Sequence, residues 1–232
     1  MRQLPLGVRL RVGSRFSTFV PGENAAAVAE LMQLSGRGGP QAAWLHGPPG
    51  SGRTHLLQAA CAAAGEAGRA AAYLPMRELA AGEPGVLAGL ETLDLVCLDD
   101  LEAVAGGADW ERALFGLYNE LGERGGRLVV AAREPPARSG FALPDLASRF
   151  AAASVLPLRP LREESQGEAL AGRAAAQGLD LPEDTLQYLL RRAPRDFAAL
   201  CRLLDEVDVA SLAAQRRLTV PLVREVLDRQ GH

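Results

Sequence analysis

The 232-residue sequence contains no lysine, so arginine supplies all 25 of its basic side chains. Against 28 acidic residues the formal net charge is only -3, which creates no strong field toward nucleic acid or anionic membranes. Long apolar runs are also missing: none has the length of a membrane span, and the N-terminus has no apolar core of the signal-peptide kind. We therefore expect a cytoplasmic protein with no membrane association.

Cysteine and histidine are scarce, with three of each. Cys61, Cys97 and Cys201 form no CxxC pair and no zinc-type spacing. Each lies among apolar neighbours, which predicts three buried free thiols, and the histidines form no ligand cluster. The sequence gives no support to a cysteine- or histidine-based metal centre.

The apolar pattern of the chain predicts an α/β base followed by a small helical domain. Five unbroken apolar runs, at residues 42–46, 70–74, 95–98, 128–131 and 154–158, alternate with helical patterns at 23–35, 53–65, 84–93, 109–124 and 144–150. Such strands are typical of a parallel sheet covered on both faces. After Pro160 only helices are expected, at 163–176, 182–192, 195–209 and 221–229. We divide the chain into a tail (1–12), a base (13–158) and a helical domain (159–232).

One glycine-rich segment has the spacing of a phosphate-binding loop. Gly47-Pro48-Pro49-Gly50-Ser51-Gly52-Arg53-Thr54 fits the pattern GxxxxG[K/R][ST] and lies between a predicted strand and a predicted helix. In such a loop the backbone N–H groups from Gly47 to Gly52 turn onto phosphate oxygens at the positive end of the helix. Thr54 offers its hydroxyl to magnesium. The segment therefore predicts a nucleotide site with Mg²⁺.

A pair of carboxylates supports this interpretation. Asp99 and Asp100 end the apolar run that starts at Leu95. We expect Asp99 to hold magnesium, directly or through water, and Asp100 to act as the base that polarises an attacking water. The alternative is that both carboxylates merely cap a following helix.

Arg53 departs from the usual lysine of this loop. Arginine is bulkier and planar, and although it can hold a phosphate through two nitrogens, it can also misplace a γ-phosphate. One interpretation is binding without fast hydrolysis. The other is compositional drift in a chain that has no lysine at all.

Several segments together resemble the DnaA-like AAA+ family, and within it the shortened Hda branch, the regulatory inactivators of DnaA. The resemblance covers nearly the whole chain and is carried by residues 16–24, the glycine loop with its Arg53, and residues 95–100, 143–150 and 214–221. It implies an AAA+ P-loop base with a parallel five-stranded sheet, followed by an all-helical lid.

The resemblance also implies roles for single residues. Val20 and Asn24 would lie near the adenine, so that the ligand is ADP or ATP. Arg149 matches the arginine finger that enters a neighbour's nucleotide site, and Arg195 matches the second sensor of the lid. Each arginine could instead form an ordinary surface salt bridge. The strand at 128–131 ends in alanines, without the polar residue that orients water in AAA+ ATPases, which again favours weak hydrolysis.

The N-terminus resembles a peptide that docks on the DNA polymerase sliding clamp. Gln3, Leu4 and Leu6 offer a hydrogen-bonding amide and two apolar side chains for a pocket, with Pro5 restricting the free peptide. The chain ends at His232, after the predicted lid, so we expect no helix-turn-helix domain and no sequence-specific DNA binding.

We therefore expect a negative regulator of replication initiation, which links DnaA to the sliding clamp and stimulates hydrolysis of DnaA-bound ATP. A homodimer or higher oligomer is expected as a way to cover Arg149. The alternative is a self-sufficient ATPase such as a helicase loader, which Thr54, Asp99 and Asp100 would favour. A small-molecule kinase is disfavoured because no acceptor site is evident.

Overall fold

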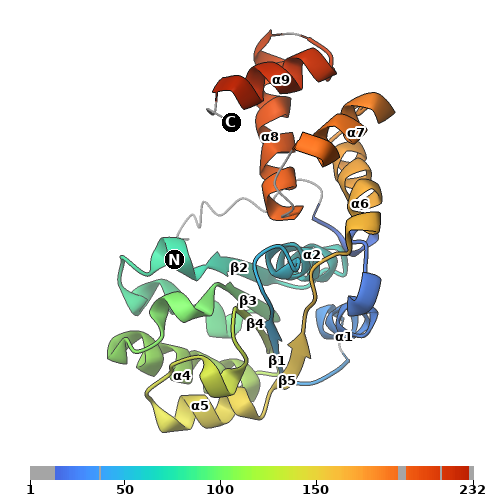
Figure 1. Cartoon of the computed structure of the whole chain (residues 1–232). Helices are drawn as coiled ribbons and strands as arrows, with labels where there is room; N and C mark the ends of the chain where they lie inside the picture. The colour runs from blue at the N-terminus through green and yellow to red at the C-terminus, as the bar shows by residue number, and fades with distance from the viewer. Residues whose placement is uncertain (1–13, 37, 193–196, 215, 230–232) are drawn as a thin grey trace.

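Five parallel strands form the central sheet of the base in the order β2-β3-β4-β1-β5 (Figure 1). The computed structural model describes residues 14–36, 38–192, 197–214 and 216–229. The strands are β1 (Ala42–His46), β2 (Ala71–Pro75), β3 (Leu95–Asp99), β4 (Arg127–Ala132) and β5 (Ser154–Pro157). The predicted strands differ from these bounds by one residue at most at either end. The predicted α/β class and five-stranded parallel sheet are confirmed.

Alternate side chains of β1, β2, β3 and β4 enter two separate cores, and β5 adds Leu156 to one of them. On one face, Trp44 and Val130 pack with α4 (Ala108–Glu123) and α5 (Pro144–Ala151). On the other, Leu45 and Val129 pack with α1 (Ala25–Ser35) and α2 (Arg53–Glu66). Because both faces are covered, the strands are apolar throughout rather than alternating.

The segment between β2 and β3 differs from the prediction. A single helix over 84–93 is wrong: the structure has two 3₁₀ helices, η3 (Pro84–Leu87) and η4 (Leu90–Thr92). Gly89 separates them with a φ of 91°, a left-handed conformation that ends a helix and that glycine adopts without strain. The remaining short helices are η1 (Phe16–Thr18), η2 (Gly22–Asn24), α3 (Met76–Leu79), η5 (Leu101–Val104) and η6 (Pro136–Arg138).

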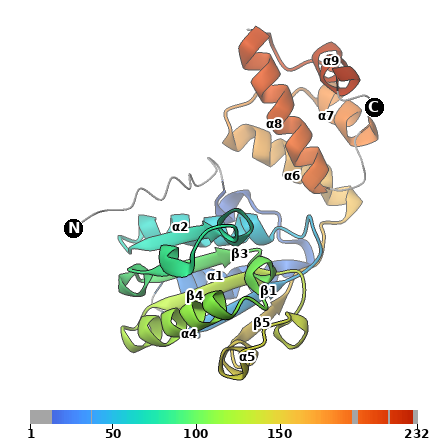
Figure 2. The same ribbon diagram turned by 90° about the vertical axis from the view of Figure 1, so that its left-hand side faces the viewer.

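The helical lid stands on the base with a core of its own (Figure 2). It consists of α6 (Glu163–Ala176), α7 (Glu183–Arg192), α8 (Phe197–Ala214) and α9 (Val220–Arg229). Leu170, Leu189, Leu204 and Val223 are fully buried within it. Across the described ranges, no helix combines the length and apolar character that crossing a bilayer requires.

The linker from β5 to the lid is fastened to the start of α1. The side-chain amide of Asn24 donates to the carbonyl of Arg159 at 2.9 Å, and its oxygen accepts from the amide of Arg159 at 2.8 Å. Beside it, Glu23 forms ion pairs with Arg159 and Arg162. These contacts hold the root of the lid against the segment that precedes α1.

Candidate nucleotide site

The glycine loop connects β1 to α2, as its spacing predicts. Gly50 and Gly52 have φ values of 80° and 92°. A Cβ on Gly47 would lie 2.5 Å from the carbonyl oxygen of Leu158, and one on Gly52 would lie 2.5 Å from Cε2 of Phe19. At both ends of the loop the neighbouring chain therefore leaves room only for glycine.

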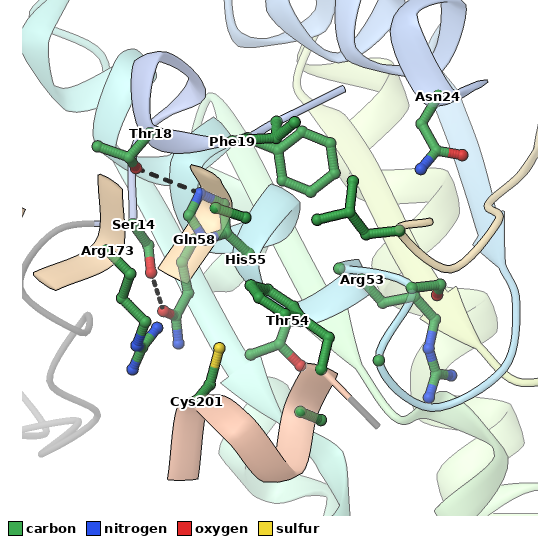
Figure 3. A pocket seen from close by; sticks show the side chains of 18 of the residues that line it. Ser14, Thr18, Phe19, Asn24, Arg53, Thr54, His55, Gln58, Arg173 and Cys201 are labelled. Atoms are coloured by element: carbon green, nitrogen blue, oxygen red, sulfur yellow. Dashed lines mark hydrogen bonds between the residues drawn. The ribbon is translucent and has the colours of Figure 1, made fainter. Parts of the chain in front are cut away.

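A cavity of about 310 Å³ lies between the loop and the lid (Figure 3). Its walls come from the segment before α1, the loop and α2, the linker, and the lid helices α6 and α8: Ser14, Thr18, Phe19, Val20, Asn24, Gly50, Ser51, Gly52, Arg53, Thr54, His55, Gln58, Leu161, Ala169, Arg173, Phe197, Ala198, Cys201 and Arg202. Val20 and Asn24 line this cavity, and the amide of Asn24 is bonded to Arg159; their place near an adenine stays a prediction. Cys201 is half-buried, so its predicted full burial is wrong: it faces this cavity.

Two aromatic rings form one wall of the cavity. Phe19 and His55 pack with their ring centroids 5.4 Å apart. Nε2 of His55 lies 2.9 Å from the carbonyl oxygen of Arg15, and burial lowers the pKa of His55 below its usual value. Aromatic ring faces of this kind suit a nucleobase. The sequence analysis missed this pair, although His55 follows the loop motif directly.

Two polar atoms beside the loop are buried and have no hydrogen-bond partner within the described part of the chain. They are Oγ of Ser51 and Nη1 of Arg53, on residues that are 3% and 9% exposed. An unsatisfied buried donor costs about 1–3 kcal/mol. Both residues line the cavity, so an anionic ligand there can satisfy them.

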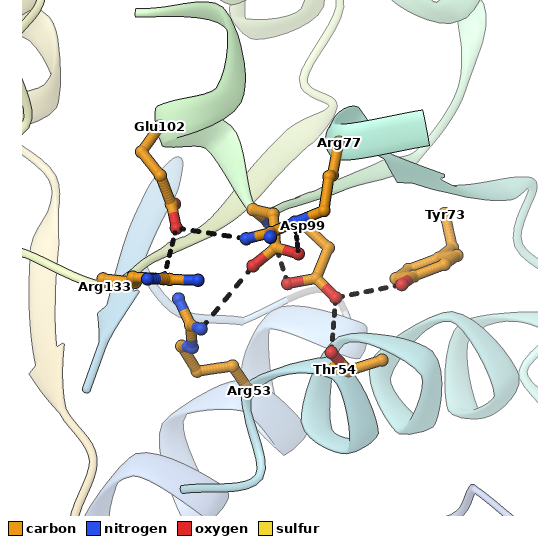
Figure 4. Close-up of polar contacts among 8 residues, drawn as sticks. Arg53, Thr54, Tyr73, Arg77, Asp99, Glu102 and Arg133 are labelled. Atoms are coloured by element: carbon orange, nitrogen blue, oxygen red, sulfur yellow. Dashed lines mark hydrogen bonds and ion pairs between the residues drawn. The ribbon is translucent and has the colours of Figure 1, made fainter. Parts of the chain in front are cut away.

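Asp99 lies at the end of β3, next to the start of α2 (Figure 4). Its Oδ2 accepts hydrogen bonds from the Thr54 hydroxyl at 2.6 Å and the Tyr73 hydroxyl at 2.9 Å. Burial raises the pKa of Asp99 above its usual value, although both hydrogen bonds oppose the rise. Hydroxyl and carboxylate oxygens are ligands that Mg²⁺ accepts beside phosphate and water. Thr54 and Asp99 therefore fit a nucleotide-bound magnesium ion.

The hydrogen bonds continue from Asp99 to the N-terminal segment. Burial and the neighbouring Asp99 raise the pKa of Tyr73, whose hydroxyl also bonds to Gln58. The oxygen of Gln58 accepts from the Ser14 hydroxyl at 3.0 Å. Polar Gln58 in an otherwise apolar stretch of α2 was the sequence signal for this chain of bonds, which the sequence analysis did not use.

Asp100 forms ion pairs with two arginines, both labelled in Figure 4, and it does not line the cavity. Its Oδ1 lies 3.5 Å from Nη2 of Arg53, and its Oδ2 lies 3.0 Å from Nε of Arg77. Glu102 continues the series, with Oε1 3.9 Å from Nη2 of Arg77 and 3.3 Å from Nε of Arg133. These five residues are called the ion-pair chain below.

Arg149 lies in α5, on the side of the base away from the lid (Figures 1 and 2). Its side chain is exposed, and its guanidinium carbon lies 6.0 Å from the ring centroid of Tyr118 in α4. Within the described ranges it forms no ion pair, and it does not line the cavity. The predicted finger is thus separate from the chain's own candidate site.

The loop that leads into α5 is fixed by one buried carboxylate. Glu111, 1% exposed, accepts hydrogen bonds from the backbone amides of Gly106, Ala142 and Leu143 at 2.6–3.0 Å. Burial raises the pKa of Glu111, but the three amides outweigh it and lower the pKa overall. The other predicted site residues, Arg195, Gln3, Leu4 and Leu6, lie outside the described residues.

Comparisons with known proteins agree with this architecture. Residues 163–227 match the family model of the Hda lid domain. The chain is similar to domain III of the replication initiation protein DnaA from Thermotoga maritima, with a TM-score of 0.78 and 19% identity over 96% of this chain and 98% of that one. AMPPCP-bound DnaA from Aquifex aeolicus gives 0.67 and 20% over 86% and 66%. The RuvB Holliday junction branch migration motor of Thermotoga maritima gives 0.64 and 17% over 95% and 73%.

The sheet order, the glycine loop and the helical lid together define an AAA+ protein. Within that class the fold is similar to that of DnaA domain III, and residues 163–227 match the model of the Hda lid domain.

Proposed function

We propose that the protein binds ADP or ATP with Mg²⁺ between base and lid, and that it acts in the cytoplasm as a negative regulator of replication initiation. In this proposal Gly47 to Thr54 hold the phosphates, and Thr54 and Asp99 hold the metal ion. When bound, the ion neutralises phosphate charge. The buried, unsatisfied Ser51 Oγ and Arg53 Nη1 support an anionic ligand.

The partner in this proposal is the ATP-bound DnaA initiator, to which Arg149 is presented in trans. The exposure of Arg149, on the side of the base away from its own cavity, is the observation that carries the proposal. A guanidinium inserted into a partner's site stabilises the charge of the transition state, an effect of roughly 10³–10⁵ in rate. The sliding clamp, engaged through Gln3, Leu4 and Leu6, would bring the protein to DNA after replication has begun.

The test measures hydrolysis of DnaA-bound ATP in the presence of clamp loaded on DNA. Arg149→Ala should lower the stimulated rate by about 10³-fold. Arg112→Ala is the matched control, since Arg112 is an exposed arginine of α4 that forms an ion pair with Asp109 in its own helix. Equal stimulation by wild type and Arg149→Ala would end the finger assignment. If the double variant Gln3→Ala with Leu4→Ala still binds the sliding clamp as well as wild type, the N-terminal tail is not the clamp-binding segment.

A self-sufficient ATPase is the second candidate, favoured by the Thr54–Asp99 pair at 2.6 Å. It predicts appreciable ATP turnover by the purified protein alone. Regulation of a partner predicts instead that turnover by the protein alone is slow. Extraction of the nucleotide that copurifies would identify whether ADP or ATP is the resting ligand.

A further inference from the structure

A basic surface lies on the lid, where the helices α7 and α9 pack against each other (Figure 2). Arg191 and Arg192 are the last two residues of α7, and Arg224 lies in α9. All three residues are exposed, and none of them lines the cavity. The surface is therefore separate from the candidate nucleotide site.

Tyr188 supports two of these arginines. Its ring packs against the buried core of the lid, and the guanidinium carbon of Arg192 lies 5.9 Å from the ring centroid. The hydroxyl of Tyr188 is hydrogen-bonded to Arg224, and this bond is the main cause that raises the pKa of Arg224. One ring thus holds a guanidinium group from each of the two helices. Tyr188, Arg191, Arg192 and Arg224 are called the Tyr188 patch below.

The positive charge of the patch is largely uncompensated. Within the part of the chain that the structure describes, none of its arginines forms an ion pair. Asp228, four positions after Arg224 in α9, is the acidic side chain that acts on Arg224. Arg112 and Arg138, two exposed arginines of the base, each form an ion pair with an acid within four residues. In the patch, by contrast, three guanidinium groups face one carboxylate.

Arginines placed in this way suit phosphate groups. A guanidinium can hold two phosphate oxygens at once, and one that is already fixed against a ring loses less conformational freedom on binding. Duplex DNA carries one negative charge per about 1.7 Å of its axis. Neighbouring guanidinium groups can therefore each meet a phosphate of the same duplex.

Two other anionic partners fit the patch less well. An anionic membrane also takes up apolar side chains, and the described residues of α7 and α9 expose no large apolar side chain. Single-stranded nucleic acid binds largely by stacking its bases on aromatic rings, whereas the ring of Tyr188 is covered by Arg192. The observations favour the backbone of a duplex.

We propose that the Tyr188 patch binds the phosphate backbone of duplex DNA without reading its sequence. The contact is weak in a protein whose net charge is -3, but it would let the free protein slide and hop along DNA. A protein already held by a clamp on DNA would not depend on it. Neither nucleotide nor clamp is needed for this contact, so it is tested on the full chain alone.

The experiment measures binding of the full chain to a fluorescently labelled duplex of mixed sequence, by anisotropy, between roughly 50 and 200 mM salt. Each phosphate contact adds about -0.9 to the slope of log K against log salt, so three contacts predict about -2.7. The double variant Arg192→Gln with Arg224→Gln should bind about tenfold or more weakly at the lowest salt, with a slope near about -0.9. Both residues are exposed, so the circular dichroism spectrum should not change.

The matched control is Arg112→Gln with Arg138→Gln, which changes the net charge equally at two arginines that are already paired. It should keep the affinity of wild type within about twofold, with the same slope. Equal losses in both double variants would overturn the proposal, and so would a wild type that does not bind the duplex at the lowest salt. If poly-glutamate displaces the duplex at equal charge concentration, the partner is an acidic protein, and the assignment to DNA is wrong.

Discussion

The candidate nucleotide site and the α5 face present arginine in opposite ways. In the cavity, Arg53 is 9% exposed, bound to Asp100 and enclosed by elements from both domains. On α5, Arg149 is exposed, and its guanidinium lies over the ring of Tyr118. A buried, neutralised guanidinium suits the retention of a ligand, whereas an exposed one can enter another protein. In the proposed function, the first arrangement serves nucleotide binding at one end of the base and the second serves action on a partner at the other.

Gly52→Ala should produce the largest effect on nucleotide affinity, and it should act only on the cavity. Alanine at a φ of 92° costs about 1–2 kcal/mol, and its Cβ would overlap Phe19 at 2.5 Å. We expect ADP affinity to fall about tenfold or more by fluorescence titration. Gly68→Ala is the matched control, since Gly68 has a φ of 71° with no atom within 4 Å of the added Cβ. Equal losses of affinity in both variants would show that the loss does not come from contact between the added Cβ and Phe19.

Glu111→Gln should act on the α5 face and leave nucleotide affinity unchanged. Glutamine would direct an NH₂ group toward the backbone amides whose hydrogen bonds Glu111 now accepts. This should lower the free energy of unfolding by about 1–3 kcal/mol. Folding lowers the pKa of Glu111, so the ionised carboxylate stabilises the folded protein. This stabilisation is fully present above the pKa in the unfolded chain, ~4.3, and is lost as the pH falls through the pKa in the folded protein. The difference in Tm between wild type and variant should therefore shrink in acid. A difference that is constant from pH 7 to pH 3 would count against the carboxylate.

Tyr118→Leu should give the smallest effect. It removes the ring beside Arg149, an interaction of about 0.5–1 kcal/mol at an exposed site. Stimulation of DnaA–ATP hydrolysis should fall roughly two- to fivefold, with no change in ADP binding. Tyr188→Leu is the control, because the ring of Tyr188 lies 5.9 Å from Arg192 in the lid. A comparable fall in both variants would show that the ring does not act by holding Arg149.

The elements that sequence analysis predicted are those whose signal is local. β1, β3 and β4 are runs of residues buried on both faces, and the glycine loop must have Gly47 and Gly52 where Leu158 and Phe19 approach it. The helix over 84–93 failed because its apolar spacing continues across Gly89, where the backbone changes direction. Gly89 itself was a local signal in the sequence that could have predicted the break.

The ion-pair chain was beyond such reasoning. Its residues lie between positions 53 and 133, and the order β2-β3-β4-β1 in the sheet brings the strand ends that carry them together. The positive φ of Asp100 was equally unpredictable, because no glycine marks that position in the sequence. The roles of Arg149 and Asp99 stay predictions, for which the structure supplies geometry.

The walls of the cavity run from Ser14 to Arg202, so neither domain contains the whole of it. A molecule held between two bodies adds its binding free energy to their association, because it binds only where both are present. By mass action this amounts to about 2.7 kcal/mol at a ligand concentration 100 times Kd. The arrangement of lid and base would then depend on the ligand concentration in solution. A fragment that lacks either domain would lose this dependence.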